Sequence, residues 1–192
     1  MKNLLIIQGH PDVTSLCGGL ADAYENAARE STFDVQRLDV ADLDFDPVLH
    51  LGYKEIQELE PDLRRAQDLI KWSDHLVFVY PTWWATMPAL LKGFIDRVFL
   101  PGFAFKYHDE GPWWDKLLEG RSARIISTMD APKIYFWLAY RGAGHNAMKR
   151  ATLQFCGIKP VSITTFDRVK SSDEAKRKGW LEKAAELGRR GV

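Results

Sequence analysis

Short apolar runs alternate with helical patterns along this chain, and this alternation restricts its possible folds more than any other feature. The strongest run, Leu76–Tyr80, is continuous and rich in β-branched residues, whereas Val35–Leu38 is weaker and alternates as an edge strand would. Unbroken apolar runs are typical of strands buried on both faces of a parallel sheet. The predicted strands are Leu4–Ile7, Val35–Leu38, Leu76–Tyr80, Ala123–Ser127 and Val161–Phe166.

Apolar residues at helical spacing fill the intervals between these runs. Pro61 stands in the first turn of one such pattern, where proline is well tolerated. The alternating order predicts a three-layer α/β sandwich with right-handed crossovers. Its five strands suit the order 2-1-3-4-5 better than a six-stranded Rossmann sheet. The predicted helices cover residues 15–29, 61–72, 88–98, 146–155 and 173–187.

Length and composition narrow the class of protein. With 192 residues, we expect one domain spanning 1–192. Lys and Arg together number 26, as do Asp and Glu, so the zero net charge gives no support for nucleic-acid binding through a basic surface. The apolar run near the start is only four residues long and is followed by His10-Pro11-Asp12. We interpret it as a strand and not a signal peptide, and expect a cytoplasmic protein without a membrane span.

Cysteine and acidic residues give no support for a metal site. The two cysteines, Cys17 and Cys156, exclude a disulfide framework and a cysteine-rich zinc site. Four aspartates between positions 39 and 46 resemble a calcium loop only in number, because the required glycine and closing glutamate are missing. We therefore expect no metal.

The loop after the first strand offers neutral hydrogen-bond donors beside a helix start. It lacks both the G-x-G-x-x-G fingerprint and the P-loop motif. Instead, His10 and the hydroxyl groups of Thr14 and Ser15 adjoin the first amides of a helix, an arrangement that suits a phosphate monoester. The alternative is a simple helix cap at Ser15 or Thr14, with His10 as a turn residue.

The loop after the third strand contains two adjacent tryptophans, Trp83 and Trp84, within a polar segment. One of them could cover a planar ligand by stacking while loop amides bond its polar edge. The alternative is that both fill a core or a subunit contact. Further aromatic residues occupy the long connection at Phe99–Phe105 and 112–114, which predicts either a homodimer seam or a small additional core under a loop.

These motifs resemble those of the NAD(P)H:quinone oxidoreductase family, which has a flavodoxin-like fold. The resemblance rests on Gly9-His10-Pro11 with Thr14-Ser15-Leu16, on the segments 80–84 and 88–99, on Gly102-Phe103-Ala104-Phe105, and on Phe155-Cys156-Gly157. It implies a non-covalent flavin, a homodimer, and ping-pong hydride transfer from NAD(P)H to a quinone or a similar electrophile.

The resemblance also assigns expected flavin contacts. The second flavin loop departs from the pattern, because Met129 and Asp130 stand where larger family members have two glycines. We expect the Asp130 carboxylate to point away from the flavin, or to lower its potential. The expected cofactor-binding residues are His10, Thr14, Ser15, Leu16, Pro81, Thr82, Trp83, Trp84, Ser127, Thr128, Met129 and Asp130.

Two side chains are candidates for a catalytic role through the same resemblance. The tyrosine that the family places near the flavin falls on Tyr135. Arg141 stands where larger members have a histidine, and its guanidinium could stabilise negative charge on a reduced flavin. The alternative is a surface arginine, and His145, four residues further on, is another candidate.

Three functions remain open from the sequence. The leading one is a reductase with FMN as cofactor, because little sequence follows the last strand to build an adenosine pocket; FAD is the alternative. Its acceptor would be a quinone, a nitro compound or an azo compound, and no motif selects NADH or NADPH. The others are a flavodoxin-type electron carrier and a flavin-containing regulatory subunit of a potassium-efflux system. Flavodoxin-type carriers tend to be strongly acidic, so the zero net charge of this chain argues against that function.

Overall fold

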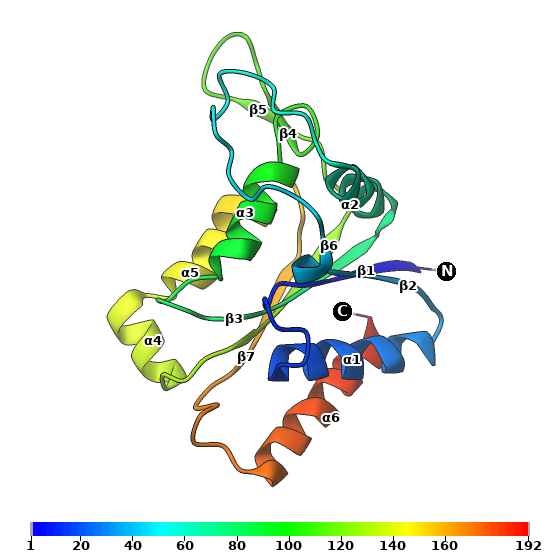
Figure 1. The fold of residues 1–192 in the computed structure, drawn as a ribbon, viewed down its shortest axis with the longest axis vertical. Coiled ribbons are helices and arrows are strands. Elements are labelled where there is room, and N and C mark those ends of the chain that lie inside the picture. Colours follow the sequence, from blue (N-terminus) through cyan, green and yellow to red (C-terminus); the bar gives the residue numbers. More distant parts are fainter. Residues whose placement is uncertain (1, 192) are drawn as a thin grey trace.

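A five-stranded parallel sheet forms the centre of the computed structural model, which describes residues 2–191 (Figure 1). Its strand order, β2-β1-β3-β6-β7, confirms the predicted order 2-1-3-4-5. Each predicted apolar run lies within one strand. The strands are β1 (Lys2–Gln8), β2 (Phe33–Asp39), β3 (His75–Pro81), β6 (Ser122–Thr128) and β7 (Val161–Phe166).

Helices cover both faces of the sheet, as Figure 1 shows. Alternate residues of β1 explain this layering: Leu5 and Ile7 pack in one core, and Leu4 and Ile6 pack in the other. Helices α1 (Leu16–Arg29) and α6 (Glu174–Arg190) enclose the second core. The first core lies under α2 (Pro61–Trp72), α3 (Ala89–Val98) and the π-helix η2 (Ala147–Gln154), which continues the short α5 (Ala143–Asn146).

Four elements of the structure were not predicted: one helix, the two strands of a hairpin and one single-turn helix. Helix α4 (Lys133–Tyr140) follows β6 directly. A two-stranded hairpin, β4 (Phe105–Tyr107) and β5 (Trp114–Lys116), projects from the long connection after α3. A single-turn helix, η1 (Val40–Asp42), also follows β2.

The aromatic residues of the long connection form an extension of the first core. Phe103 and Phe105 are buried, and the Trp114 ring stacks on Phe155 with 4.5 Å between ring centroids. Phe103 and Phe105 therefore belong to the first core itself and not to a separate one, whereas Trp113 is exposed. Within residues 2–191 no helix is long and apolar enough to span a membrane.

Candidate functional site

A cavity of about 220 Å³ lies at the carboxyl ends of the strands, where ligands bind in open α/β sheets. Loops after β1, β3, β6 and β7 each contribute to its wall. The lining residues are His10, Ser15, Leu16, Cys17, Pro81, Thr82, Trp83, Thr128, Met129, Asp130 and Val169.

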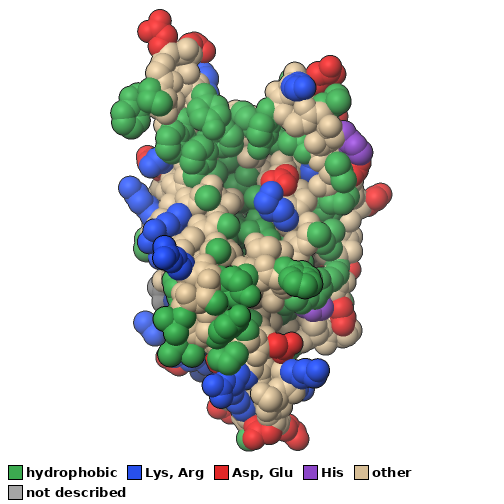
Figure 2. Space-filling view, turned by 90° about the vertical axis from the view of Figure 1, so that its left-hand side faces the viewer, with side chains coloured by type: hydrophobic (Ala, Val, Ile, Leu, Met, Phe, Trp, Pro, Cys, Tyr) green, Lys and Arg blue, Asp and Glu red, His purple; other side chains and the backbone are tan. Residues whose placement is uncertain are grey.

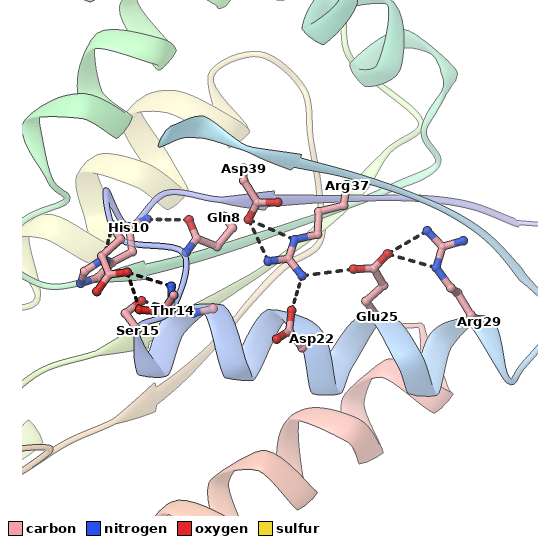
Figure 3. Close-up of polar contacts among 11 residues, drawn as sticks. Gln8, His10, Thr14, Ser15, Asp22, Glu25, Arg29, Arg37 and Asp39 are labelled. Atoms are coloured by element: carbon pink, nitrogen blue, oxygen red, sulfur yellow. Dashed lines mark hydrogen bonds and ion pairs between the residues drawn. The ribbon is translucent and has the colours of Figure 1, made fainter. Parts of the chain in front are cut away.

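The loop after β1 is shaped by a chain of hydrogen bonds (Figure 3). The Gln8 side-chain oxygen accepts from the His10 amide at 3.0 Å, and His10 Nδ1 accepts from the Asp12 amide at 2.9 Å. Asp12 in turn accepts from both the amide and the hydroxyl group of Thr14. Burial lowers the pKa of His10, while the nearby Asp12 charge acts in the opposite direction. A neutral His10 ring that accepts at Nδ1 carries its proton on Nε2, which leaves this atom as a donor.

The start of α1 faces the cavity with unpaired backbone donors. Ser15 caps the helix, since its side-chain oxygen accepts from the Gly18 amide. The amides of Leu16 and Cys17 are in the first turn, where no intrahelical acceptor is available. A Cβ atom on Gly18 would collide with the carbonyl group of Val13, so only glycine allows the loop to lie this close to the helix. The lining contains no lysine or arginine, so an anion at this position would be held by helix amides and neutral donors.

The loop after β3 makes a tight two-residue turn that carries both tryptophans. Trp83 and Thr86 exchange backbone hydrogen bonds of 2.8 and 2.9 Å. Trp84 and Ala85 lie between them with φ angles of 50° and 61°. Trp83 is 45% exposed and Trp84 is fully exposed, which excludes the alternative that they fill a core of this chain. The Trp83 and His10 rings form a T-shaped pair with 5.4 Å between ring centroids, which connects the loops after β1 and β3.

The loop after β6 is hydrogen-bonded to the loops after β3 and β7. The Thr128 carbonyl oxygen accepts from the Thr82 amide at 2.6 Å, and the Met129 carbonyl oxygen accepts from the Val169 amide. One carboxylate oxygen of Asp130 accepts from the Lys170 amide at 2.9 Å. This hydrogen bond ties the Asp130 carboxylate to the β7–α6 loop.

Some predicted site residues lie outside the cavity lining. Thr14 uses its hydroxyl group on Asp12, and Trp84 extends into solvent. Ser127 is buried, and its hydroxyl group contacts His145 Nε2 at 2.9 Å. The two catalytic candidates belong to α4: Tyr135 is exposed beside Tyr140, and Arg141 ends the helix in a left-handed conformation. Their roles stay predictions.

Two lining residues were missed from the sequence. Cys17 is not among the expected cofactor-binding residues; it is buried, and its thiol lies 3.3 Å from the Thr128 hydroxyl group at the cavity wall. Val169 follows β7, and the rule that ligands bind at the carboxyl ends of parallel strands would have found it if applied to the last strand.

Buried polar atoms at the site fit a ligand that forms hydrogen bonds. Thr82 Oγ1 and Gln8 Nε2 are inaccessible to solvent and have no hydrogen-bond partner within residues 2–191. Unsatisfied buried polar groups are uncommon in folded proteins. Thr82 lines the cavity, so a ligand bound there could satisfy its hydroxyl group.

Comparison with known proteins assigns the chain to a family. The Flavodoxin_2 family model, described as a flavodoxin-like fold, matches residues 2–189. The chain belongs to the Flavodoxin_2 family. The resemblance and the fold class predicted from the sequence motifs are thereby confirmed.

Relatives of this Flavodoxin_2 protein include NAD(P)H-dependent enzymes. An uncharacterized NAD(P)H oxidoreductase of Haemophilus influenzae is 28% identical over 190 residues, covering 96% of this chain and 93% of that protein. NAD(P)H dehydrogenase (quinone) 1 of Cavia porcellus is 27% identical, covering 83% of this chain and 66% of the relative. The crystal structure of Smu.1420 from Streptococcus mutans matches with a TM-score of 0.81 at 32% identity, covering 98% of this chain and 99% of that one.

Proposed function

We propose that this protein is a flavin-dependent NAD(P)H oxidoreductase that reduces quinones or similar small electrophiles such as nitro and azo compounds. The cavity at the carboxyl ends of the strands carries this proposal, because it joins a helix start to a partly exposed tryptophan. A bound flavin would supply the redox chemistry, accepting a hydride from NAD(P)H and passing two electrons with protons to the acceptor.

The residues of the first loop would hold the flavin phosphate. Ser15, the amides of Leu16 and Cys17, and the Nε2 donor of His10 would bind the phosphate oxygens, with Thr14 at the rim. Such a site carries no fixed positive charge from lysine or arginine. A single phosphate group matches a single helix start, which supports FMN as the cofactor over FAD.

The ring system of the flavin would lie between the other loops. Trp83 and the neighbouring Pro81 and Thr82 would contact one side of it. The backbone of Thr128, Met129 and Asp130 would border another edge, where amide donors can stabilise negative charge. These residues orient the cofactor and exclude water, while no protein nucleophile is required.

A homodimer is part of the proposal. Helix α4 exposes large apolar side chains on the face that Figure 2 shows, where hydrophobic side chains gather in the lower part of the view. Exposed apolar patches of this kind mark interaction sites. The α4 patch consists of Ile134, Tyr135, Trp137, Leu138 and Tyr140.

Absorbance spectroscopy of the purified protein tests the proposal. We expect flavin bands that disappear on anaerobic addition of NADH or NADPH and return when a small quinone is added. The mass of the cofactor released by denaturation should be that of FMN. A preparation without colour should first be titrated with FMN and with FAD.

Two results would overturn the proposed activity. A protein that binds neither flavin contradicts the cofactor assignment itself. A bound flavin that stays oxidised with both nicotinamides contradicts the reductase and leaves the electron-carrier or regulatory function.

A further inference from the structure

The turn that carries the tryptophans holds an unfavourable backbone conformation. Trp84 and Ala85 both have positive φ angles, 50° and 61°, in a two-residue turn that usually contains asparagine or glycine. For residues with a Cβ atom, such conformations persist only where surrounding structure enforces them. Some neighbouring element must therefore hold this turn.

Helix α5 packs directly against the turn through a glycine. A Cβ atom on Gly144 would collide with the Ala85 carbonyl oxygen and would lie 2.7 Å from Thr86 Cα. The absence of a side chain lets the start of α5 lie against the backbone of the turn. Gly144 is itself buried.

The next residue fastens α5 to the central sheet. His145 is buried, and its Nε2 atom lies 2.9 Å from the hydroxyl group of Ser127, near the end of β6. Ser127 also contacts the Thr165 hydroxyl group on β7 at 3.1 Å. The His145 ring packs against the Phe136 ring of α4 with 4.8 Å between ring centroids. Burial lowers the pKa of His145 to about 4, so the ring is neutral near pH 7.

We propose that Gly144 and His145 form a clamp that holds the Trp83–Thr86 turn in its left-handed conformation, and that His145 is a positioning residue for the flavin cavity. Gly144 packs against the backbone of the turn, and the adjacent His145 is hydrogen-bonded to Ser127 of β6. The residue after Ser127, Thr128, lines the cavity. The effect on the flavin rests on the proposed function, whereas the effect on the turn does not.

The chain provides a matched control at the other end of the same strands. His75 is also buried, and its Nδ1 atom lies 2.8 Å from the Ser122 hydroxyl group, so that it too joins a histidine to a serine of β6. His75 and Ser122 begin β3 and β6, whereas the cavity lies where these strands end. Replacing either histidine removes a comparable buried contact, but only His145 lies next to the residue that packs on the turn.

Hydrogen exchange in the flavin-free protein tests the clamp directly. In His145→Phe we expect the Trp83 and Thr86 amides, which bond across the turn, to exchange about tenfold faster than in the unmodified protein. In His75→Phe these amides should exchange at the original rate. Equal rates in His145→Phe and the unmodified protein would overturn the proposal, whether or not the protein binds flavin.

Flavin titration then tests whether the clamp shapes the cavity. His145→Phe should raise the FMN dissociation constant about tenfold, whereas His75→Phe should change it less than about twofold. A loss of thermal stability in both variants with the FMN dissociation constant unchanged in both would show that His145 is merely structural. If the unmodified protein binds no flavin, the proposed function fails while the exchange test remains decisive.

A rescue variant separates strain in the turn from general destabilisation. Glycine adopts positive φ angles without penalty, so Ala85→Gly should reduce the need for the clamp. In the double variant His145→Phe, Ala85→Gly, we expect the FMN dissociation constant to return to within about threefold of the original. Strictly additive effects of the two substitutions would contradict the coupling.

Discussion

At the residue scale, Thr82 should have opposite effects on the free and the bound protein. Its buried hydroxyl group has no partner within residues 2–191, and leaving such a group unsatisfied costs roughly 1–3 kcal/mol. We expect Thr82→Val to preserve or raise the free energy of unfolding of the flavin-free protein. The same change should weaken FMN binding about tenfold, because the ligand loses a hydrogen bond.

Thr14 provides the control for Thr82. Its hydroxyl group is exposed and already bonds to Asp12, outside the cavity lining. Thr14→Val should change the FMN dissociation constant less than Thr82→Val does, as measured by the same titration. The reverse ranking would mean that the phosphate binds at Thr14 and that the Thr82 hydroxyl group does not face the ligand.

The buried histidines predict how stability depends on pH. Burial lowers the pKa of His75 to about 3 and that of His145 to about 4, against about 6.5 in an unfolded chain. Below about pH 6.5 the unfolded chain therefore binds protons that the folded protein does not, and the free energy of unfolding falls as the pH decreases toward 4. Urea unfolding at pH 7 and pH 5.5 should show this loss, and a smaller loss in His75→Phe, His145→Phe.

At the scale of elements, the sequence predicts the sheet well because buried parallel strands need unbroken apolar runs. Helix α4 was missed because its sequence lacks the alternation of apolar and polar residues by which a surface helix is recognised. Seven of its residues, Ile134–Tyr140, are apolar or aromatic with no helical period, and most of them are exposed. The hairpin strands β4 and β5 have three residues each, too few to show an alternating pattern.

Within the site, the sequence located the loops more reliably than the side chains. Ser127 and Thr128 are consecutive residues of β6, so their side chains point to opposite faces, and only Thr128 lines the cavity. Trp83 precedes the tight turn and Trp84 is its first central residue, and only Trp83 lines the cavity. Which of two adjacent side chains lines the cavity depends on the alternation of side chains along a strand and on the geometry of the turn, and a sequence motif alone shows neither.

Adjacent glycines in α1 should respond differently to alanine. A Cβ atom on Gly18 would collide with Val13, whereas on Gly19 it would reach only the Leu181 side chain at an ordinary 3.6 Å. We expect Gly18→Ala to displace the first loop, weaken FMN binding and lower stability. Gly19→Ala should raise the free energy of unfolding by up to about 1 kcal/mol, because alanine favours the helix. Similar melting temperatures and dissociation constants in the two variants would contradict this reasoning.

At the scale of the whole molecule, the exposed α4 patch predicts self-association. Leu138 is 78% exposed, and a charge at this position would be buried in an interface. We expect sedimentation or light scattering to report a dimer for the unmodified protein and a larger monomer fraction for Leu138→Glu. Ala175→Glu, which adds the same charge on α6 across the sheet, should remain a dimer.

Sedimentation of the unmodified protein alone can refute the α4 interface. A monomer at micromolar concentration would leave the patch without a partner copy. Dimers that persist in Leu138→Glu would place the contact on another face of the molecule.

Because Cys17 lies at the cavity wall, the rate of its alkylation should report whether a cofactor occupies the cavity. Cys17 is one of the residues that line the cavity, and burial raises the pKa of its thiol to about 11, so alkylating reagents should modify it slowly. A bound flavin would cover the approach from the cavity and slow that modification further. Cys156 is buried elsewhere in the first core and supplies an internal standard. The ratio of the two labelled peptides in a mass spectrum would then measure cofactor occupancy in a crude mixture, where colour cannot be assigned to one protein.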